Sequence, residues 1–155
     1  MNARPAMNII EQLETTRDRT LPYFDLSESQ LERSYGKGKW SVRFLLHHLS
    51  DAETVLYDRI CRVISEPRQV IWAFNQDDWA KGLDYSHRPL DISRRIYESV
   101  RAGVIHQTRL HYEKNGHLEF VHSETGVRTL KNEMDKIASH NEDHLKQIEL
   151  ALKNS

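Results

Sequence analysis

Residues 137–148 read IASHNEDHLKQI, and the rest of the chain can be interpreted outward from this stretch. It belongs to a segment with helical periodicity, and its two histidines, His140 and His144, stand four residues apart. That spacing places both imidazoles on one face of a helix, one turn apart, where they can bind a single metal ion. Two histidines make an incomplete site, so a third ligand is expected from elsewhere in the chain.

Amphipathic segments account for most of the remaining sequence. Long helices are predicted over 7–19, 42–65, 90–114 and 130–153. Pro22 and Pro67 end the first two, because proline cannot continue a helix. Long amphipathic helices with little strand signal predict an all-α fold, a helical bundle that occupies residues 1–155 as one domain.

The connections carry weaker signals. A capping-box pattern predicts a short helix over 27–35. The aromatic-rich region 67–89 is a long connection in which we expect a short helix over 77–82. Alternating residues over 117–129 predict a small extended hairpin just before the last helix.

Composition narrows the class of protein. The 155 residues carry 22 basic and 23 acidic side chains, so no basic excess indicates nucleic-acid binding. No apolar run is long enough for a signal peptide or a membrane span, and the single cysteine, Cys61, excludes an internal disulfide. We therefore expect a cytoplasmic protein that acts on a small molecule, without nucleic-acid or membrane partners. The nine histidines are the first indication of metal or proton chemistry.

The helix predicted over 42–65 offers the third ligand. On a helical wheel, His48 lies at the edge of the apolar stripe and should point inward, whereas His47 falls on the polar side and should point outward. Three histidines with a position left for water are typical of a catalytic zinc site, where the water becomes acidic near neutral pH. The alternative is that these histidines are hydrogen-bonded packing residues, because H-x-x-x-H also arises by chance in a histidine-rich chain.

Two polar residues on apolar faces are further candidates. Asn141 could orient a ligand histidine, or it could be a buried amide that is satisfied across the bundle. Arg59 could bind an anionic substrate group or pair with a carboxylate such as Glu53 or Glu142. For Arg59 we favour a stem packed on the core with its head in solvent.

Three more residues could act near the site. His106 lies at the edge of the apolar stripe of its helix; it could be a general acid or base, but a packed core residue is the favoured interpretation. Trp79 and Tyr85 could line a substrate pocket over the end of the bundle. Simple capping of the core is the favoured role for both.

Three blocks of the sequence, in this order, resemble the DinB/YfiT-like superfamily. Residues 38–53, GKWSVRFLLHHLSDAE, resemble its W-S…H-L-x-D-x-E block. Residues 116–130 look like the loop before its final helix, and residues 140–148 look like its terminal H-x-x-x-H-x-x-Q-I. The resemblance covers nearly the whole chain. Asn141 departs from the aspartate often found after the first of the two terminal histidines.

This resemblance implies a four-helix bundle with a long crossover, in up-down-down-up order. It implies a divalent metal on His48, His140 and His144, since the first block ends in His-Leu, and it implies a homodimer. The metal could be nickel, zinc, manganese or iron. The implied activity is that of a metal-dependent hydrolase or of an S-transferase that uses a low-molecular-weight thiol such as bacillithiol or mycothiol. The alternative function is a non-enzymatic metal- or ligand-binding module for sensing or stress.

Overall fold

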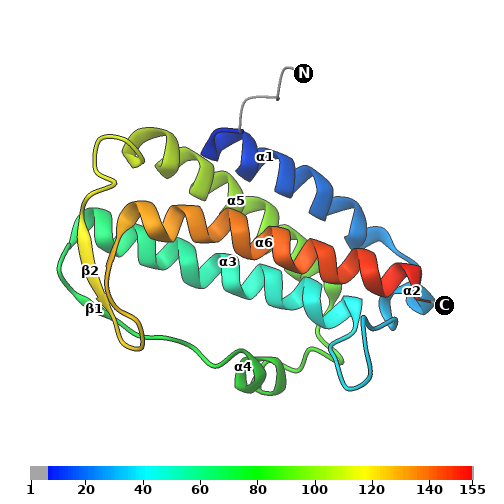
Figure 1. Cartoon of the computed structure of the whole chain (residues 1–155). Helices are drawn as coiled ribbons and strands as arrows, with labels where there is room; N and C mark the ends of the chain where they lie inside the picture. Colours follow the sequence, from blue (N-terminus) through cyan, green and yellow to red (C-terminus); the bar gives the residue numbers. More distant parts are fainter. Residues whose placement is uncertain (1–6, 155) are drawn as a thin grey trace.

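The computed structural model describes residues 7–154, which are organised around four long helices (Figure 1). These are α1 (Ile9–Thr20), α3 (Val42–Ser65), α5 (Leu90–His111) and α6 (Leu130–Lys153). α1 and α6 run in one direction and α3 and α5 in the other, which confirms the expected four-helix bundle in up-down-down-up order. α3 and α6 each pack against two of the other long helices, α3 against α5 and α6, and α6 against α1 and α3.

Local side-chain chemistry fixes where the long helices begin. The Asn8 side chain accepts a hydrogen bond from the Glu11 backbone amide, and the Asn8 backbone amide donates to the Glu11 carboxylate. This reciprocal pair is a capping box. The Ser41 hydroxyl accepts from the Phe44 amide at 3.3 Å, and Thr129 caps α6. These caps place the helix starts within two residues of the sequence prediction.

The short elements after α1 differ from the prediction. A 3-10 turn, η1 (Leu21–Asp25), continues α1, and α2 (Glu28–Leu31) is only one turn long. The predicted helix over 27–35 is therefore wrong beyond Leu31. There the chain leaves the helix and forms a bridge between Ser34 and Ser41, which turns it toward α3.

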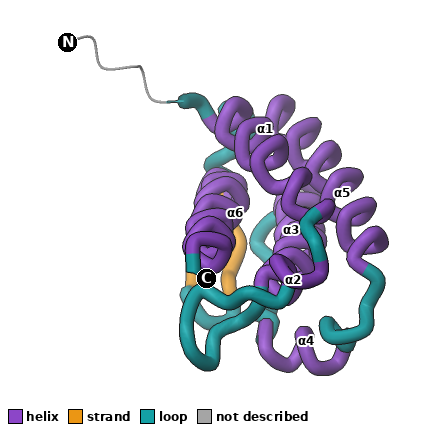
Figure 2. Tube along the Cα trace, turned by 90° about the vertical axis from the view of Figure 1, so that its right-hand side faces the viewer, coloured by secondary structure: helices purple, strands orange, loops and turns teal. Residues whose placement is uncertain are grey.

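Because α3 and α5 are parallel, residues 66–89 must return along the length of the bundle (Figure 1). This crossover contains β1 (Val70–Ile71) and α4 (Gln76–Gly82). The expected hairpin is present as β2 (Glu119–His122) and β3 (Gly126–Thr129), and β1 adds to it in parallel with β2. Figure 2 shows α4 outside the bundle, beneath α3. No helix within residues 7–154 is long and apolar enough to cross a membrane.

A polar network joins all four long helices inside the core. Arg101 is fully buried on α5 and forms a two-point ion pair with Glu53 of α3. The same guanidinium donates to the Leu13 carbonyl and the Thr16 hydroxyl of α1, both at 2.8 Å. It also donates to the side-chain oxygen of Asn141 on α6 at 2.7 Å. One side chain therefore fixes the relative positions of the four helices.

Candidate metal centre

The structure brings His48 of α3 together with His140 and His144 of α6. His48 Nε2 lies 3.1 Å from His140 Nε2, and His140 Nε2 lies 3.0 Å from His144 Nε2. The four-residue spacing on α6 puts two of these nitrogens on the face that packs against α3. The Nε2 atoms of the three imidazoles thus converge on one point.

The hydrogen bonding around these rings fits a metal site. His144 Nδ1 lies 2.7 Å from the Gln147 side-chain oxygen, which can only accept, so Nδ1 carries the proton and Nε2 presents its lone pair. His48 Nδ1 is buried without a partner among residues 7–154. A neutral imidazole has only one N–H group, so three converging Nε2 atoms suit a cation between them better than mutual hydrogen bonds. The donor set fits zinc, nickel and similar divalent ions.

Burial keeps the three imidazoles in the form that binds metals. Desolvation, followed by repulsion from His144, lowers the pKa of His48 to about 3. Desolvation, again followed by repulsion from its histidine neighbours, lowers the pKa of His140 to about 2. Burial also lowers the pKa of His144, although its bond to Gln147 opposes the shift. Neutral imidazoles need not release a proton before they bind a cation.

Aromatic side chains form a wall beside His48. The Trp40 ring meets the His48 ring edge-on, with centroids 5.2 Å apart. Phe74 of the crossover stacks on the His48 ring, with centroids 6.3 Å apart. Trp79 packs edge-on against Phe74, with ring centroids 5.0 Å apart. The crossover therefore contributes an apolar cover to the centre, which shields it from bulk water.

A cavity of about 230 Å³ opens beside His144. Its wall includes Tyr35, Lys39, Trp40, Asp77 and Gln147. Charged and polar groups thus lie next to His144, toward the end of the bundle where α6 finishes. Of the three histidines only His144 lines this cavity, which is somewhat smaller than a typical small-molecule pocket.

The prediction that His47 points outward is wrong. His47 is fully buried, and its Nδ1 lies 2.7 Å from the Ser93 hydroxyl of α5. The wheel gave α3 a solvent face, but α5 and the crossover cover that face. Tyr85 lies on the same side, where its hydroxyl donates to Asp51 at 2.6 Å and its ring packs 5.2 Å from that of His47. Tyr85 therefore caps the core and does not contact the three converging imidazoles.

Asn141 is a buried amide whose hydrogen bonds are satisfied across the bundle, and it does not orient a ligand histidine. Its oxygen accepts from Arg101 at 2.7 Å and from the Tyr97 hydroxyl at 2.6 Å. Its nitrogen donates to the Thr20 hydroxyl at 2.9 Å. Both ends of the amide are used in holding α6 to α1 and α5, so it forms no hydrogen bond with the adjacent His140.

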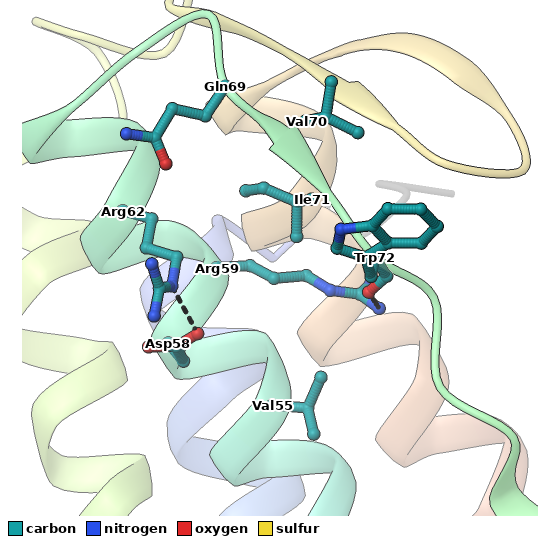
Figure 3. Close-up of a pocket in the computed structure, with 8 residues that line it drawn as sticks. All are labelled: Val55, Asp58, Arg59, Arg62, Gln69, Val70, Ile71 and Trp72. Carbon is teal, nitrogen blue, oxygen red and sulfur yellow. Dashed lines mark hydrogen bonds and ion pairs between the residues drawn. The ribbon is translucent and has the colours of Figure 1, made fainter.

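Arg59 does not extend its head into solvent as expected. It is 3% exposed, its Nη1 lies 3.5 Å from a Glu133 oxygen, and its Nη2 donates to the Trp72 carbonyl at 3.3 Å. Figure 3 shows this guanidinium under Trp72, in the wall of a cavity of about 340 Å³ between α3 and β1. The expected partners Glu53 and Glu142 are instead paired with other arginines.

His106 was expected to be a packed core residue, and that expectation is wrong because it is exposed on the outer side of α5.

Three residues at the centre were not singled out from the sequence: Gln147, Trp40 and Phe74. Gln147 had a usable signal, because it follows His144 by three residues on the same helical face. Phe74 had none, since only the path of the crossover brings it to His48.

The fold and the centre together define a four-helix bundle with a three-histidine site suited to a divalent cation. A family model described as the DinB superfamily matches residues 12–148, and the chain belongs to this superfamily. The solved structure of YfiT from Bacillus subtilis, a four-helix bundle of unusual topology, superposes with a TM-score of 0.85 at 22% identity. The match covers 99% of this chain and 93% of YfiT.

Two curated relatives come from Oceanobacillus iheyensis. The first is 27% identical over 147 residues, which cover 94% of this chain and 84% of the relative. The second is 30% identical over 142 residues, which cover 92% of this chain and 81% of the relative. Each of these two proteins carries the name "Putative metal-dependent hydrolase".

Proposed function

We propose that this protein is a metal-dependent hydrolase that acts on a small molecule. The observation that carries the proposal is the convergence of three Nε2 atoms, with neighbouring pairs 3.0 and 3.1 Å apart. A divalent cation bound there would supply Lewis-acid chemistry and make water a nucleophile near neutral pH. The names of the two Oceanobacillus iheyensis relatives support this class of reaction.

The chain itself supplies orientation, shielding and access. Gln147 holds the His144 ring in the tautomer that presents Nε2. Trp40 and Phe74 cover His48 and limit water at the centre. Lys39 lines the adjacent cavity and offers a hydrogen-bond donor for a polar substrate group.

A low-molecular-weight thiol is the second candidate co-reactant, in an S-transfer reaction. Three histidine ligands leave room for a thiolate as well as for water, and a bound metal keeps a thiol deprotonated. A module that binds only a metal would need the same three histidines but no cavity, so the cavity beside His144 supports a protein that also takes up a small molecule. The homodimer and the cytoplasmic location stay predictions.

The test compares two histidine variants of the full chain. After incubation with zinc, nickel, manganese or iron and removal of free ions, the wild type should retain about one ion per chain. His144→Ala should lose it, whereas His106→Ala, which changes an exposed histidine outside the site, should retain it. The loaded proteins are then given a panel of ester, amide and phosphoester substrates, and a second panel with thiols and electrophiles.

Hydrolysis that requires both the metal and His144 supports the proposal. Turnover only when a thiol is present would replace hydrolysis by S-transfer. Metal retention by His144→Ala equal to that of the wild type would contradict the assignment of the centre. A loaded protein that is inactive on both panels would leave the binding module as the function.

A further inference from the structure

A cluster of cations lies where the hairpin meets α6, outside the metal centre. Glu133 is fully buried on α6, and two guanidinium groups share its carboxylate. Arg128 Nε donates to one oxygen at 2.9 Å, and Arg59 Nη1 lies 3.5 Å from the other. One negative charge thus faces two positive charges in a region where charges are poorly hydrated.

Lys136 adds a third cation to this cluster. It is half-buried on α6, and its ammonium group forms no ion pair or hydrogen bond with any residue from 7 to 154. Burial lowers its pKa; Glu133 opposes this shift, and repulsion by Arg59 and Arg128 adds to it. The exposed Glu124 contributes only a weaker attraction. Three cations around one buried carboxylate leave an excess of positive charge.

His122 contributes a further donor on the bundle-facing side of β2. It is 5% exposed, and its Nδ1 accepts the amides of Glu124 at 3.2 Å and Thr125 at 3.3 Å. Because Nδ1 accepts, the proton of the neutral ring is on Nε2, which is a donor. The Arg59 Nε–H is also buried and has no partner among the described residues. The cluster therefore has unused donors together with its excess charge.

The cluster lies close to the metal centre along α6. Lys136 precedes His140 by one helical turn and Glu133 precedes it by two, so the cluster begins about 6 Å and ends about 11 Å from His140 along the helix axis. Repulsion by Lys136 also contributes to the lowered pKa of His140, which indicates that the two side chains are near each other. The α6 residues of the cluster and His140 therefore lie on one helix, within about two turns of each other.

We propose that Arg59, Arg128, Lys136 and His122 form an oxyanion subsite, which binds a phosphate or carboxylate group of the substrate. Guanidinium and ammonium groups form short charge-assisted hydrogen bonds to such oxygens, and a bound anion would balance the buried positive excess. The placement of the rest of the substrate at the metal centre rests on the hydrolase function proposed above. The substrate class is then an anionic small molecule, with its reactive bond roughly one to two helical turns from the charged group.

The test measures binding of inorganic phosphate and of acetate to the full chain by calorimetry, as purified and again after chelation. Lys136→Met is the informative variant, because this ammonium has no partner in residues 7–154 and its loss leaves the Glu133 ion pairs in place. We expect at least one of the two anions to bind, and Lys136→Met to weaken its binding about tenfold, the loss of one charge-assisted bond. Lys146→Met, on the exposed side of the same helix, is the matched control and should bind like the wild type.

Four outcomes separate this subsite from the proposed function. If neither anion binds, or if Lys136→Met binds as tightly as the wild type, the subsite is overturned even when metal and hydrolysis are present. If phosphate binding disappears on chelation, the anion was bound by the metal, and the subsite is again overturned. Anion binding that survives chelation and depends on Lys136 supports the subsite, even if the metal tests above fail. With a hydrolysable substrate, Lys136→Met should raise KM for an anionic ester much more than for its neutral analogue.

Discussion

Acid should destabilise the metal-free protein well above the pH at which its carboxylates are protonated. Burial lowers the pKa of His47 to about 4, of His48 to about 3 and of His140 to about 2, from the ordinary value of 6.5. The folded chain therefore keeps these rings neutral at pH 5.5, whereas the unfolded chain takes up protons as the pH falls below 6.5. The stability that the neutral rings contribute is complete above pH 6.5 and is lost as the pH falls toward the folded pKa values.

The size of the effect follows from the proton uptake of the unfolded chain. At pH 5.5 a histidine with a pKa of 6.5 is about nine-tenths protonated, which lowers the free energy of the unfolded state by about 1.4 kcal/mol per ring. Three such rings give a loss of about 4 kcal/mol between pH 7.5 and pH 5.5. Small domains have a free energy of unfolding of about 5–15 kcal/mol, so the loss is a large share of the total.

Urea denaturation with a chelator present, at pH 7.5 and at pH 5.5, measures this difference. The wild type should lose about 4 kcal/mol, and His48→Gln should lose about 1.4 kcal/mol less over the same interval, because one titrating ring is gone. The comparison is made within each protein, so the overall stability of the variant does not matter. An equal loss in both proteins, or no loss in the wild type, would refute the burial argument.

Three further predictions concern single side chains. Arg101→Met leaves the buried Glu53 without its partner and should reduce the free energy of unfolding by about 3–5 kcal/mol in urea; a double variant with Glu53→Gln should recover part of that loss. Gln147→Leu removes the acceptor that orients His144, and competition with a chromophoric chelator should show zinc affinity reduced about 10- to 100-fold, whereas Gln147→Glu should retain it. Asn8→Ala removes the cap of α1 and should cost about 1 kcal/mol in thermal unfolding, with metal affinity unchanged.

The helices could be predicted from the sequence because their information is local. The apolar stripe of α3 and the cap at Ser41 are contained in one segment, and the structure has α3 over Val42–Ser65 as expected. The hairpin was predicted for the same reason. β1 was missed because it is two residues long and exists only through pairing with β2, some fifty residues away. No local pattern could have indicated that pairing.

Two of the wrong predictions, those for His47 and Arg59, fail for one physical reason. A helical wheel assigns a polar residue to solvent, but α3 is enclosed by α5, α6 and the crossover, so residues on most of its circumference are buried. His47 finds a partner on α5, and Arg59 finds Glu133 74 residues further along the chain. A pair of this kind depends on which helices become neighbours. The sequence of α3 alone does not determine that.

The Arg101 network explains why the histidines meet at all. Apolar stripes would permit α6 to rotate or slip against α3 with little loss of buried area, because the hydrophobic effect has no direction. Asn141 removes that freedom: its amide must face both Arg101 and Thr20, and a one-turn slip of α6 would take the buried Asn141 amide away from both of these partners. His140 is the adjacent residue, so the network sets its rotation about the helix axis and, one turn on, that of His144. The convergent geometry that a metal requires is thus imposed by buried polar groups that form no hydrogen bond with the three histidines.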